Sequence, residues 1–177
     1  MATEKMLSNF TFVLGGAASG KSLYAESLVT GTGAPRVYIA TGEAWDEEMR
    51  AKIAAHVDQR GPGWRTIEAP LDLAPALASV SQDEVALLDC ATMWMSNQML
   101  AENDLETETA RLLEALVACK GKVVVVSNEV GMGIVPENAL ARRFRDVQGR
   151  LNKRLAAAAD TVLFVAAGLP LTMKAPA

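Results

Sequence analysis

A glycine-rich segment near the amino terminus has the residue types and spacing of a phosphate-binding loop. The segment fits the pattern G-x-x-x-x-G-K-[ST] and consists of Gly15, Gly16, Ala17, Ala18, Ser19, Gly20, Lys21 and Ser22. Glycines let successive backbone N–H groups turn toward a polyphosphate, the lysine reaches the β- and γ-phosphates, and the serine hydroxyl can bind Mg²⁺. The segment therefore predicts a site for a nucleoside triphosphate and Mg²⁺, with Lys21 as the catalytic cation.

The residues on either side of this loop predict the structure that such a site requires. An apolar run over 10–14 predicts a strand, and residues 21–29 predict a helix that begins at Lys21. The positive end of the helix dipole would then point at the bound phosphates. A glycine-rich turn that fits the pattern by chance is the alternative, and this strand–loop–helix context argues against it.

Polar residues follow the other predicted strands at the points where those strands end. In an open parallel sheet, ligands bind beyond the carboxyl ends of the strands. The polar residues there are Thr41, Gly42, Glu43, Glu68, Asp89, Ser127, Asn128 and Glu129. Asp89 follows four apolar residues and suits a carboxylate that holds Mg²⁺ directly or through water. The alternative is that Asp89 caps a helix beginning at Cys90. We favour the metal role because the loop requires a metal partner.

His56 is the single histidine of the chain. It lies in the segment 46–59, where apolar residues recur every four positions and predict a helix with His56 at the margin of the apolar face. These apolar residues are Met49, Ile53 and Val57. A structural role is the alternative for a histidine in this position. As a nucleophile, a neutral imidazole can attack the α-phosphate of a nucleoside triphosphate and expel pyrophosphate. The lysine and Mg²⁺ of the loop would neutralise the phosphate charge during that attack.

The elements that must position these side chains alternate along the chain. Short apolar runs predict strands at 10–14, 36–41, 64–68, 85–89, 122–127 and 161–166, with helices in most of the intervals. The runs 85–88 and 123–126 are continuously apolar, as expected for central strands covered on both faces. The sequence therefore predicts a three-layer α/β fold of the P-loop NTPase (RecA-like) type with a mostly parallel central sheet.

The last long helix is predicted from apolar residues at spacings of four, three, four and four. They are Leu140, Phe144, Val147, Leu151 and Leu155, in a segment that begins after Pro136 and ends near Asp160. Its arginines lie off this stripe, so we expect a solvated face rather than phosphate contacts. They are Arg142, Arg143, Arg145, Arg150 and Arg154. The segment 152–155 begins like the N-K-x-D guanine reader of regulatory GTPases, but Leu155 replaces the aspartate, and we reject that match.

Composition sets the class of protein. A chain of 177 residues predicts a single domain over 1–177 with a substantial core. A net charge of −4 argues against broad nucleic-acid binding. No segment approaches the ~18 apolar residues of a membrane span and no signal-peptide pattern begins the chain, so we expect a cytoplasmic protein. Cys90 and Cys119 show neither disulfide nor metal-ligand spacing, and we expect two buried thiols.

Several segments together carry a family pattern. They are 15–22, 38–41, 64–68, 87–90, 127–138 and 143–146, with the helix that carries His56 and with Asn152. The segment 127–138 (Ser-Asn-Glu-Val-Gly-Met-Gly-Ile-Val-Pro-Glu-Asn) is the most specific, whereas many nucleotide-binding proteins share the loop. In these segments, and nearly end to end, the chain resembles the bifunctional adenosylcobinamide kinase / adenosylcobinamide-phosphate guanylyltransferase family of cobalamin biosynthesis.

The resemblance implies two reactions on the aminopropanol arm of a corrinoid. Adenosylcobinamide is first phosphorylated on its hydroxyl with ATP or GTP, and GMP is then transferred from GTP to that phosphate, giving adenosylcobinamide-GDP. The resemblance also implies a homotrimer that uses Mg²⁺, with His56 as the guanylylated residue. It implies that the phosphate loop, Thr41, Gly42, Val57, Asp58, Gln59, Arg60, Glu68 and Asp89 surround the guanine nucleotide. Ser22 and Asp89 are the metal ligands that we expect.

Two positions depart from the common family pattern. Ala18 stands where arginine is common, which removes a possible phosphate contact, and Asp89 stands where glutamate also occurs, which shortens the reach of the carboxylate by one methylene. Two alternative functions remain open. One is a kinase of another small metabolite in which His56 is structural. The other is a non-catalytic nucleotide-dependent switch, which the missing N-K-x-D element and the lack of a long charged tail disfavour.

Overall fold

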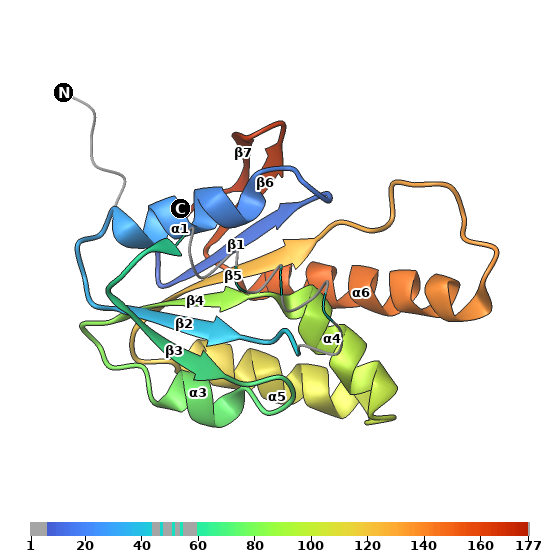
Figure 1. Ribbon diagram of the computed structural model, residues 1–177, viewed down its shortest axis with the longest axis horizontal. Helices are drawn as coiled ribbons and strands as arrows, with labels where there is room; N and C mark the ends of the chain where they lie inside the picture. The colour runs from blue at the N-terminus through green and yellow to red at the C-terminus, as the bar shows by residue number, and fades with distance from the viewer. Residues whose placement is uncertain (1–6, 44–46, 48–50, 52–53, 55–59, 177) are drawn as a thin grey trace.

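Every strand predicted from the sequence is present in the computed structural model, which describes residues 7–43, 47, 51, 54 and 60–176 (Figure 1). The strands are β1 (Phe10–Gly15), β2 (Arg36–Ala40), β3 (Trp64–Glu68), β4 (Val85–Asp89), β5 (Lys122–Asn128), β6 (Thr161–Ala166) and β7 (Leu169–Lys174). They form a seven-stranded sheet in the order β3-β2-β4-β5-β1-β6-β7. Neighbouring strands are parallel except for β6 and β7, so the predicted, mostly parallel sheet is confirmed.

Strand β7 is absent from the sequence prediction. It returns antiparallel to β6 through Ala167 and Gly168, whose φ angles are 51° and 76°. Positive φ at both positions of a two-residue turn matches the twist of a hairpin. All of β7 is exposed, so it lacks the buried apolar pattern by which the other strands are recognised.

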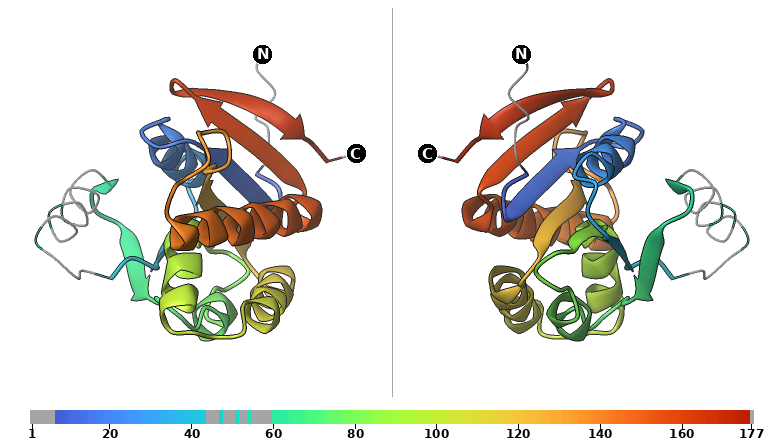
Figure 2. Two further views of the ribbon diagram at one scale, coloured as in Figure 1. Left: turned by 90° about the vertical axis from the view of Figure 1, so that its right-hand side faces the viewer. Right: turned by 90° about the vertical axis from the view of Figure 1, so that its left-hand side faces the viewer.

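Helices cover the two faces of the sheet unequally. Those with described bounds are α1 (Lys21–Thr30), α3 (Ala74–Ala78), α4 (Ala91–Leu100), α5 (Leu105–Ala118) and α6 (Ala139–Ala158). Figure 2 shows α1 on one face and α3, α4, α5 and α6 on the other. Within the residues that the structure describes, no helix is both long and apolar enough to cross a membrane. The layers confirm the predicted three-layer α/β fold.

Two apolar cores result from the alternation of side chains along the strands. Phe12 of β1 packs with the larger helical layer, whereas its neighbour Val13 packs with α1. The four residues 85–88 of β4 and the four residues 123–126 of β5 are all buried. This confirms the expectation that the two continuously apolar runs form strands covered on both faces.

Helix α6 follows the predicted stripe with one exception. Val147, Leu151 and Leu155 are buried and Phe144 is half-buried, but Leu140 is 58% exposed. Leu140 belongs to the predicted stripe but is not buried, because the first turn of α6 extends beyond the sheet, together with the segment that connects it to β5 (Figure 1). The arginines of α6 are exposed or half-buried.

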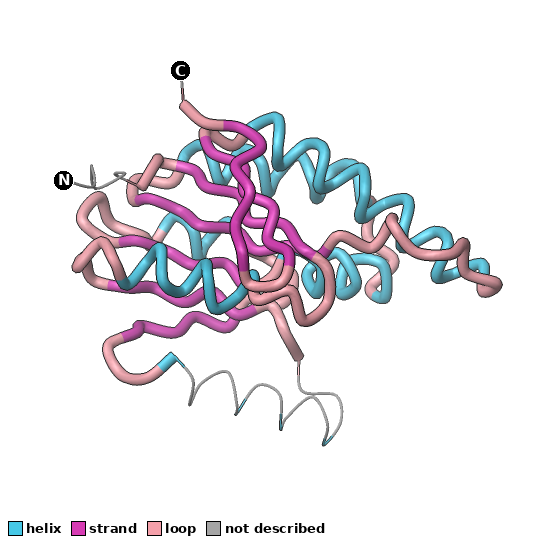
Figure 3. Tube along the Cα trace, turned by 90° about the horizontal axis from the view of Figure 1, so that it is seen from above, coloured by secondary structure: helices cyan, strands magenta, loops and turns pink. Residues whose placement is uncertain are grey.

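The parallel strands bring the predicted site residues to one edge of the sheet. Figure 3 shows the strands side by side from above. Ala40 of β2 is in register with Glu68 of β3 and with Asp89 of β4, so these three residues form one row. On the other side of β4, the register places Asn128 of β5 opposite Gly15, where the phosphate loop begins.

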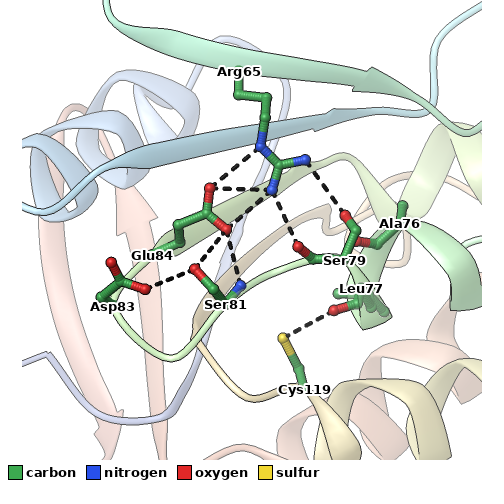
Figure 4. A network of polar contacts seen from close by, with 8 residues as sticks. All are labelled: Arg65, Ala76, Leu77, Ser79, Ser81, Asp83, Glu84 and Cys119. Atoms are coloured by element: carbon green, nitrogen blue, oxygen red, sulfur yellow. Dashed lines mark hydrogen bonds and ion pairs between the residues drawn. The ribbon is translucent and has the colours of Figure 1, made fainter.

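The opposite end of β3 is joined to the turn before β4 by a polar cluster (Figure 4). The guanidinium of Arg65 forms an ion pair of 3.0 Å with Glu84 and donates to the backbone oxygen of Ser79 at 3.3 Å. The backbone N–H of Ser81 donates to Glu84 at 2.8 Å. These contacts hold the outer strand β3 at its amino end, and the site residues lie at its other end.

Candidate nucleotide-binding site

The predicted phosphate loop connects β1 to α1. Lys21 is the first residue of α1, and Gly20 before it has a φ of 88°, a conformation that favours glycine. A Cβ on Gly15 would lie 2.6 Å from both the hydroxyl oxygen of Ser19 and the carbonyl oxygen of Val165, so a larger residue does not fit there. No side chain caps the first turn of α1, and its N–H groups are therefore available to an anion.

Lys21 is held inside this loop. Its side chain is 9% exposed and donates from Nζ to the carbonyl oxygen of Gly16 at 3.1 Å. Burial lowers the pKa of Lys21 from its ordinary value, and the neighbouring Cys90 and Asp89 act in the opposite direction. A phosphate bound in the loop would stabilise the ammonium that burial disfavours.

Asp89 ends β4 beside the loop and is not a helix cap. The N-cap of α4 is Cys90, whose sulfur accepts a hydrogen bond from the backbone N–H of Met93 at 3.4 Å. The helix-cap alternative for Asp89 is therefore wrong. Its carboxylate accepts a hydrogen bond of 3.1 Å from the hydroxyl of Tyr38. Asp89 thus lies between the buried lysine and a buried tyrosine.

Arg60 lies over the ring of Tyr38. The guanidinium carbon is 3.3 Å from the ring centroid, and the ring of Trp64 meets the same tyrosine edge-on at 6.0 Å. The Nε and Nη1 atoms of Arg60 are buried and have no hydrogen-bond partner among the described residues. Buried donors without a partner are costly, so this guanidinium is suited to an anionic or carbonyl ligand.

The remaining predicted residues of the carboxyl edge differ in their surroundings. The hydroxyl of Thr41 donates to the backbone oxygen of Cys90 and accepts from its N–H, both at 2.8 Å. Asn97 donates to the backbone oxygen of Thr41 at 2.8 Å. Thr41 therefore joins the ends of β2 and β4 and holds the backbone that leads into Gly42. Glu68, in contrast, is exposed. His56, Val57, Asp58 and Gln59 lie outside the described residues, and in the predicted helix 46–59 only Glu47, Ala51 and Ala54 are described.

Sequence reasoning missed a buried polar network behind the loop. Ser127 donates to Asn152 at 2.7 Å, and Gln148 donates to Ser127 at 2.9 Å. Asn152 donates in turn to the backbone oxygen of Asn128 at 3.0 Å. The network thereby holds the end of β5 beside the phosphate loop. The available signal is that Gln148 and Asn152, four residues apart, interrupt the apolar face of α6.

The two cysteines are partly exposed, and three arginines of α6 lie away from the predicted nucleotide site. Cys90 and Cys119 are half-buried rather than fully buried, which corrects the prediction. Burial raises the pKa of Cys90 to about 11 and also raises that of Cys119. Arg143, Arg150 and Arg154 line a cavity of about 600 Å³ between α4, α5 and α6 that contains none of the predicted nucleotide-binding residues.

The donors at the carboxyl edge fit Mg²⁺ bound together with a nucleotide. The described residues contain no group of three or more His, Cys, Asp or Glu side chains that could hold a metal alone. Mg²⁺ needs no such group, because it is commonly bound by one or two protein oxygens, nucleotide phosphates and water. Ser22 and Asp89 supply oxygen donors of that type.

Solved structures share this fold at low sequence identity. The RadB recombinase matches with a TM-score of 0.53 and 16% identity, over 88% of this chain and 73% of that chain. The flagellar accessory protein FlaH of Methanocaldococcus jannaschii matches with a TM-score of 0.52 and 10% identity, over 95% of this chain and 79% of that chain. These similarities concern the fold, which is that of P-loop NTPases.

Proteins found by sequence comparison are far more similar to this chain than these solved structures are. The bifunctional adenosylcobalamin biosynthesis protein CobU of Salmonella typhimurium is 45% identical over 179 residues, covering 92% of this chain and 98% of that protein. The family described as cobinamide kinase / cobinamide phosphate guanyltransferase matches residues 11–173. The resemblance seen in the sequence motifs is thus confirmed, and the chain belongs to this family.

Proposed function

We propose that this chain is a bifunctional enzyme that phosphorylates adenosylcobinamide with ATP or GTP and then transfers GMP from GTP to the product. The observation that carries the proposal is the phosphate loop with its buried Lys21 beside Asp89, in a chain of this family. Residues 1–177 act as one nucleotide-binding kinase and guanylyltransferase domain in this proposal. The kinase step gives adenosylcobinamide phosphate and a nucleoside diphosphate, and the guanylyl step gives adenosylcobinamide-GDP and pyrophosphate.

The nucleotide site comprises residues from several carboxyl ends and from the segment before β3. Its members are Gly15, Gly16, Ala17, Ala18, Ser19, Gly20, Lys21, Ser22, Thr41, Gly42, Val57, Asp58, Gln59, Arg60, Glu68 and Asp89. Two buried donors of Arg60 without a hydrogen-bond partner among the described residues support its role toward the nucleotide. Ser22 and Asp89 would hold Mg²⁺, which when bound supplies neutralisation of phosphate charge.

In the kinase step, catalysis depends mainly on positioning of the reactants and on electrostatic stabilisation of the phosphates. The loop amides and Lys21 bind the β- and γ-phosphates of ATP or GTP, and the corrinoid hydroxyl attacks the γ-phosphorus. The bond from the γ-phosphorus to the bridging oxygen breaks as the nucleoside diphosphate leaves. Glu68 and Glu129 are the candidates for accepting the hydroxyl proton, since Glu68 ends β3 and Glu129 directly follows β5 at this edge.

In the guanylyl step, His56 is the nucleophile. Its neutral imidazole attacks the α-phosphorus of GTP, a P–N bond forms, and pyrophosphate leaves. An oxygen of the corrinoid phosphate then attacks the same phosphorus, the P–N bond breaks and the imidazole is restored. Lys21 stabilises the charge on the triphosphate in the first half of this exchange.

A steady-state assay with adenosylcobinamide tests the proposed function. Nucleotide consumption that depends on the corrinoid, with release of both nucleoside diphosphate and pyrophosphate, supports it. A kinase of another small metabolite would release no pyrophosphate with this substrate, and a nucleotide switch would show no corrinoid-dependent consumption at all. Either result contradicts the proposal.

We also propose a cytoplasmic homotrimer. Exposed apolar side chains support assembly, because monomers rarely expose such groups together. On β7 they are Leu169, Leu171 and Met173, and in the segment before α6 they are Met132, Ile134 and Val135. Light scattering coupled to gel filtration should give three times the monomer mass, and a monomer mass at micromolar concentration contradicts the trimer.

A further inference from the structure

Tyr38 contacts two charged residues from different parts of the chain, Asp89 at the carboxyl end of β4 and Arg60 in the segment before β3. We propose that Tyr38 is a positioning residue of the nucleotide site, which fixes the Asp89 carboxylate through its hydroxyl and the Arg60 guanidinium through its ring. The proposal rests on the proposed function in that Asp89 and Arg60 act on a bound nucleotide. Tyr38 itself touches neither the nucleotide nor the reacting atoms in this role.

The strand register explains why the tyrosine hydroxyl reaches the carboxylate. Tyr38 lies opposite Leu87 of β4, and both side chains belong to the core beneath α1. Asp89 is two residues further along β4 and therefore leaves the same face of the sheet. The tyrosine side chain extends toward the carboxyl edge and donates to Oδ2 of Asp89 at 3.1 Å.

The ring of Tyr38 is held on two sides. The guanidinium of Arg60 stacks on it at 3.3 Å, and Trp64 contacts it edge-on at 6.0 Å with an interplanar angle of 89°. Tyr38 is only 7% exposed. Contacts on two sides restrict the rotamer of the Tyr38 side chain, so the position of its hydroxyl oxygen is fixed, and the carboxylate that accepts the hydrogen bond is fixed with it.

The hydrogen bond from Tyr38 orients the carboxylate of Asp89. An ionised carboxylate offers about four acceptor positions, so a hydrogen bond from tyrosine and a metal ion can share the same group. Outer partners that orient a metal-binding carboxylate typically strengthen metal binding by about 10–100-fold. Stacking on an aromatic face likewise holds a guanidinium without using its N–H groups, so the Nε and Nη1 atoms of Arg60 remain able to donate.

Measurements of nucleotide affinity with and without Mg²⁺ distinguish the effect of the Tyr38–Asp89 hydrogen bond from that of the Tyr38–Arg60 stack. A fluorescent GTP analogue is titrated into each variant in excess Mg²⁺ and in EDTA, and thermal unfolding is recorded. Tyr38→Phe keeps the ring and loses the hydroxyl, so affinity in EDTA should stay within about twofold of wild type while affinity in Mg²⁺ falls about 10-fold. Tyr38→Leu also loses the stack on Arg60, so affinity should fall in both conditions.

Two controls test whether the effect passes through Asp89. Tyr24→Phe changes the other tyrosine of the chain, on α1, and should bind like wild type in both conditions. In an Asp89→Asn background, Tyr38→Phe should weaken binding in Mg²⁺ by less than about twofold, because the hydroxyl acts through the carboxylate that is already lost.

Three results overturn the proposal. One is a Tyr38→Phe variant that binds the analogue in Mg²⁺ as tightly as wild type. The second is an equal loss in Mg²⁺ and in EDTA together with a lowered melting temperature, which would mark a purely structural role. The third is an undiminished effect of Tyr38→Phe in the Asp89→Asn background. A wild-type protein that binds the analogue but shows no corrinoid-dependent turnover contradicts the proposed function and leaves this test intact.

Discussion

The backbone N–H of Gly168 donates a hydrogen bond of 2.8 Å to the carbonyl oxygen of Ser19, so the turn between β6 and β7 rests on the phosphate loop. On the other side of the loop, the N–H of Glu129 donates to the carbonyl oxygen of Gly15 at 2.9 Å. The loop is therefore held between the ends of β5 and β6, the two strands that flank β1. Such support fixes the backbone amides before a ligand arrives, which lowers the cost of binding.

Gly15→Ala should destabilise the protein by about 1–3 kcal/mol, because a methyl group there would meet atoms of Ser19 and Val165 at 2.6 Å. Urea denaturation measures the change. Gly16→Ala is the matched control, since a Cβ at Gly16 meets nothing within 4 Å, and its free energy of unfolding should change by less than about 0.5 kcal/mol. Equal stability of the two variants contradicts the close approach described for Gly15.

Lys21→Ala should reduce both corrinoid phosphorylation and GMP transfer by about 100-fold or more, because both reactions use the same triphosphate site. Initial rates with saturating corrinoid and nucleotide measure the loss. Lys120→Ala, at an exposed lysine, should keep both rates. GMP transfer at the wild-type rate in Lys21→Ala would refute the shared site.

Asn152→Ala should lower the free energy of unfolding by about 1–3 kcal/mol, because it leaves the buried Ser127 hydroxyl and Gln148 amide without their shared partner. Denaturant titration measures this free energy. The control is Lys153→Ala, at the neighbouring exposed residue, which should unfold like wild type. If both variants unfold alike, the network does not stabilise the end of β5.

Glu84→Gln should be less stable than wild type at neutral pH but not in acid. The backbone N–H of Ser81 and then the Arg65 guanidinium hold the pKa of Glu84 below its ordinary 4.5 (Figure 4). A depressed pKa contributes stability above pH 4.5, and this contribution is lost as the pH falls through the folded pKa. The melting temperature should differ by about 2–4 °C at pH 7.

The difference between wild type and Glu84→Gln should disappear in strong acid, where both side chains are neutral. High salt should reduce it at pH 7, because the cluster is near the surface. Glu114→Gln, at an exposed glutamate, should melt like wild type at each pH. A constant difference between Glu84→Gln and wild type across the whole pH range would show that the charge of Glu84 is not its cause.

The sequence predicts the buried helices and strands well because their apolar residues recur at regular spacings. The runs in β4 and β5 are apolar on both faces, and the loop at 15–22 requires the strand and helix found beside it. Strand β7 is not predicted because it is exposed along its length, and the exposure of Leu140 could not be predicted because the stripe does not show where the sheet ends.

Site residues can be predicted where a single sequence segment indicates their role. Contacts between residues from distant segments cannot be predicted in this way. Lys21 and Asp89 each stand at a strand or helix end that the local sequence indicates. The contact of Tyr38 with Asp89, and the stack of Arg60 on Tyr38, depend on the register of two strands and on tertiary packing. No local spacing encodes them.

Loss of His56 should separate the two proposed reactions. His56→Ala should abolish GMP transfer because the chain has no second imidazole, while phosphorylation of the corrinoid continues in part. Equal loss of both activities in a folded variant would indicate a general role in nucleotide binding.

Incubation of the protein with GTP labelled at the α-phosphate tests the covalent transfer most directly. Wild-type protein should retain the label after denaturation and lose it in acid, as a phosphoramidate does, and His56→Asn should retain none. Wild-type protein that stays unlabelled under turnover conditions, or a His56→Asn variant that carries the same label, contradicts the account.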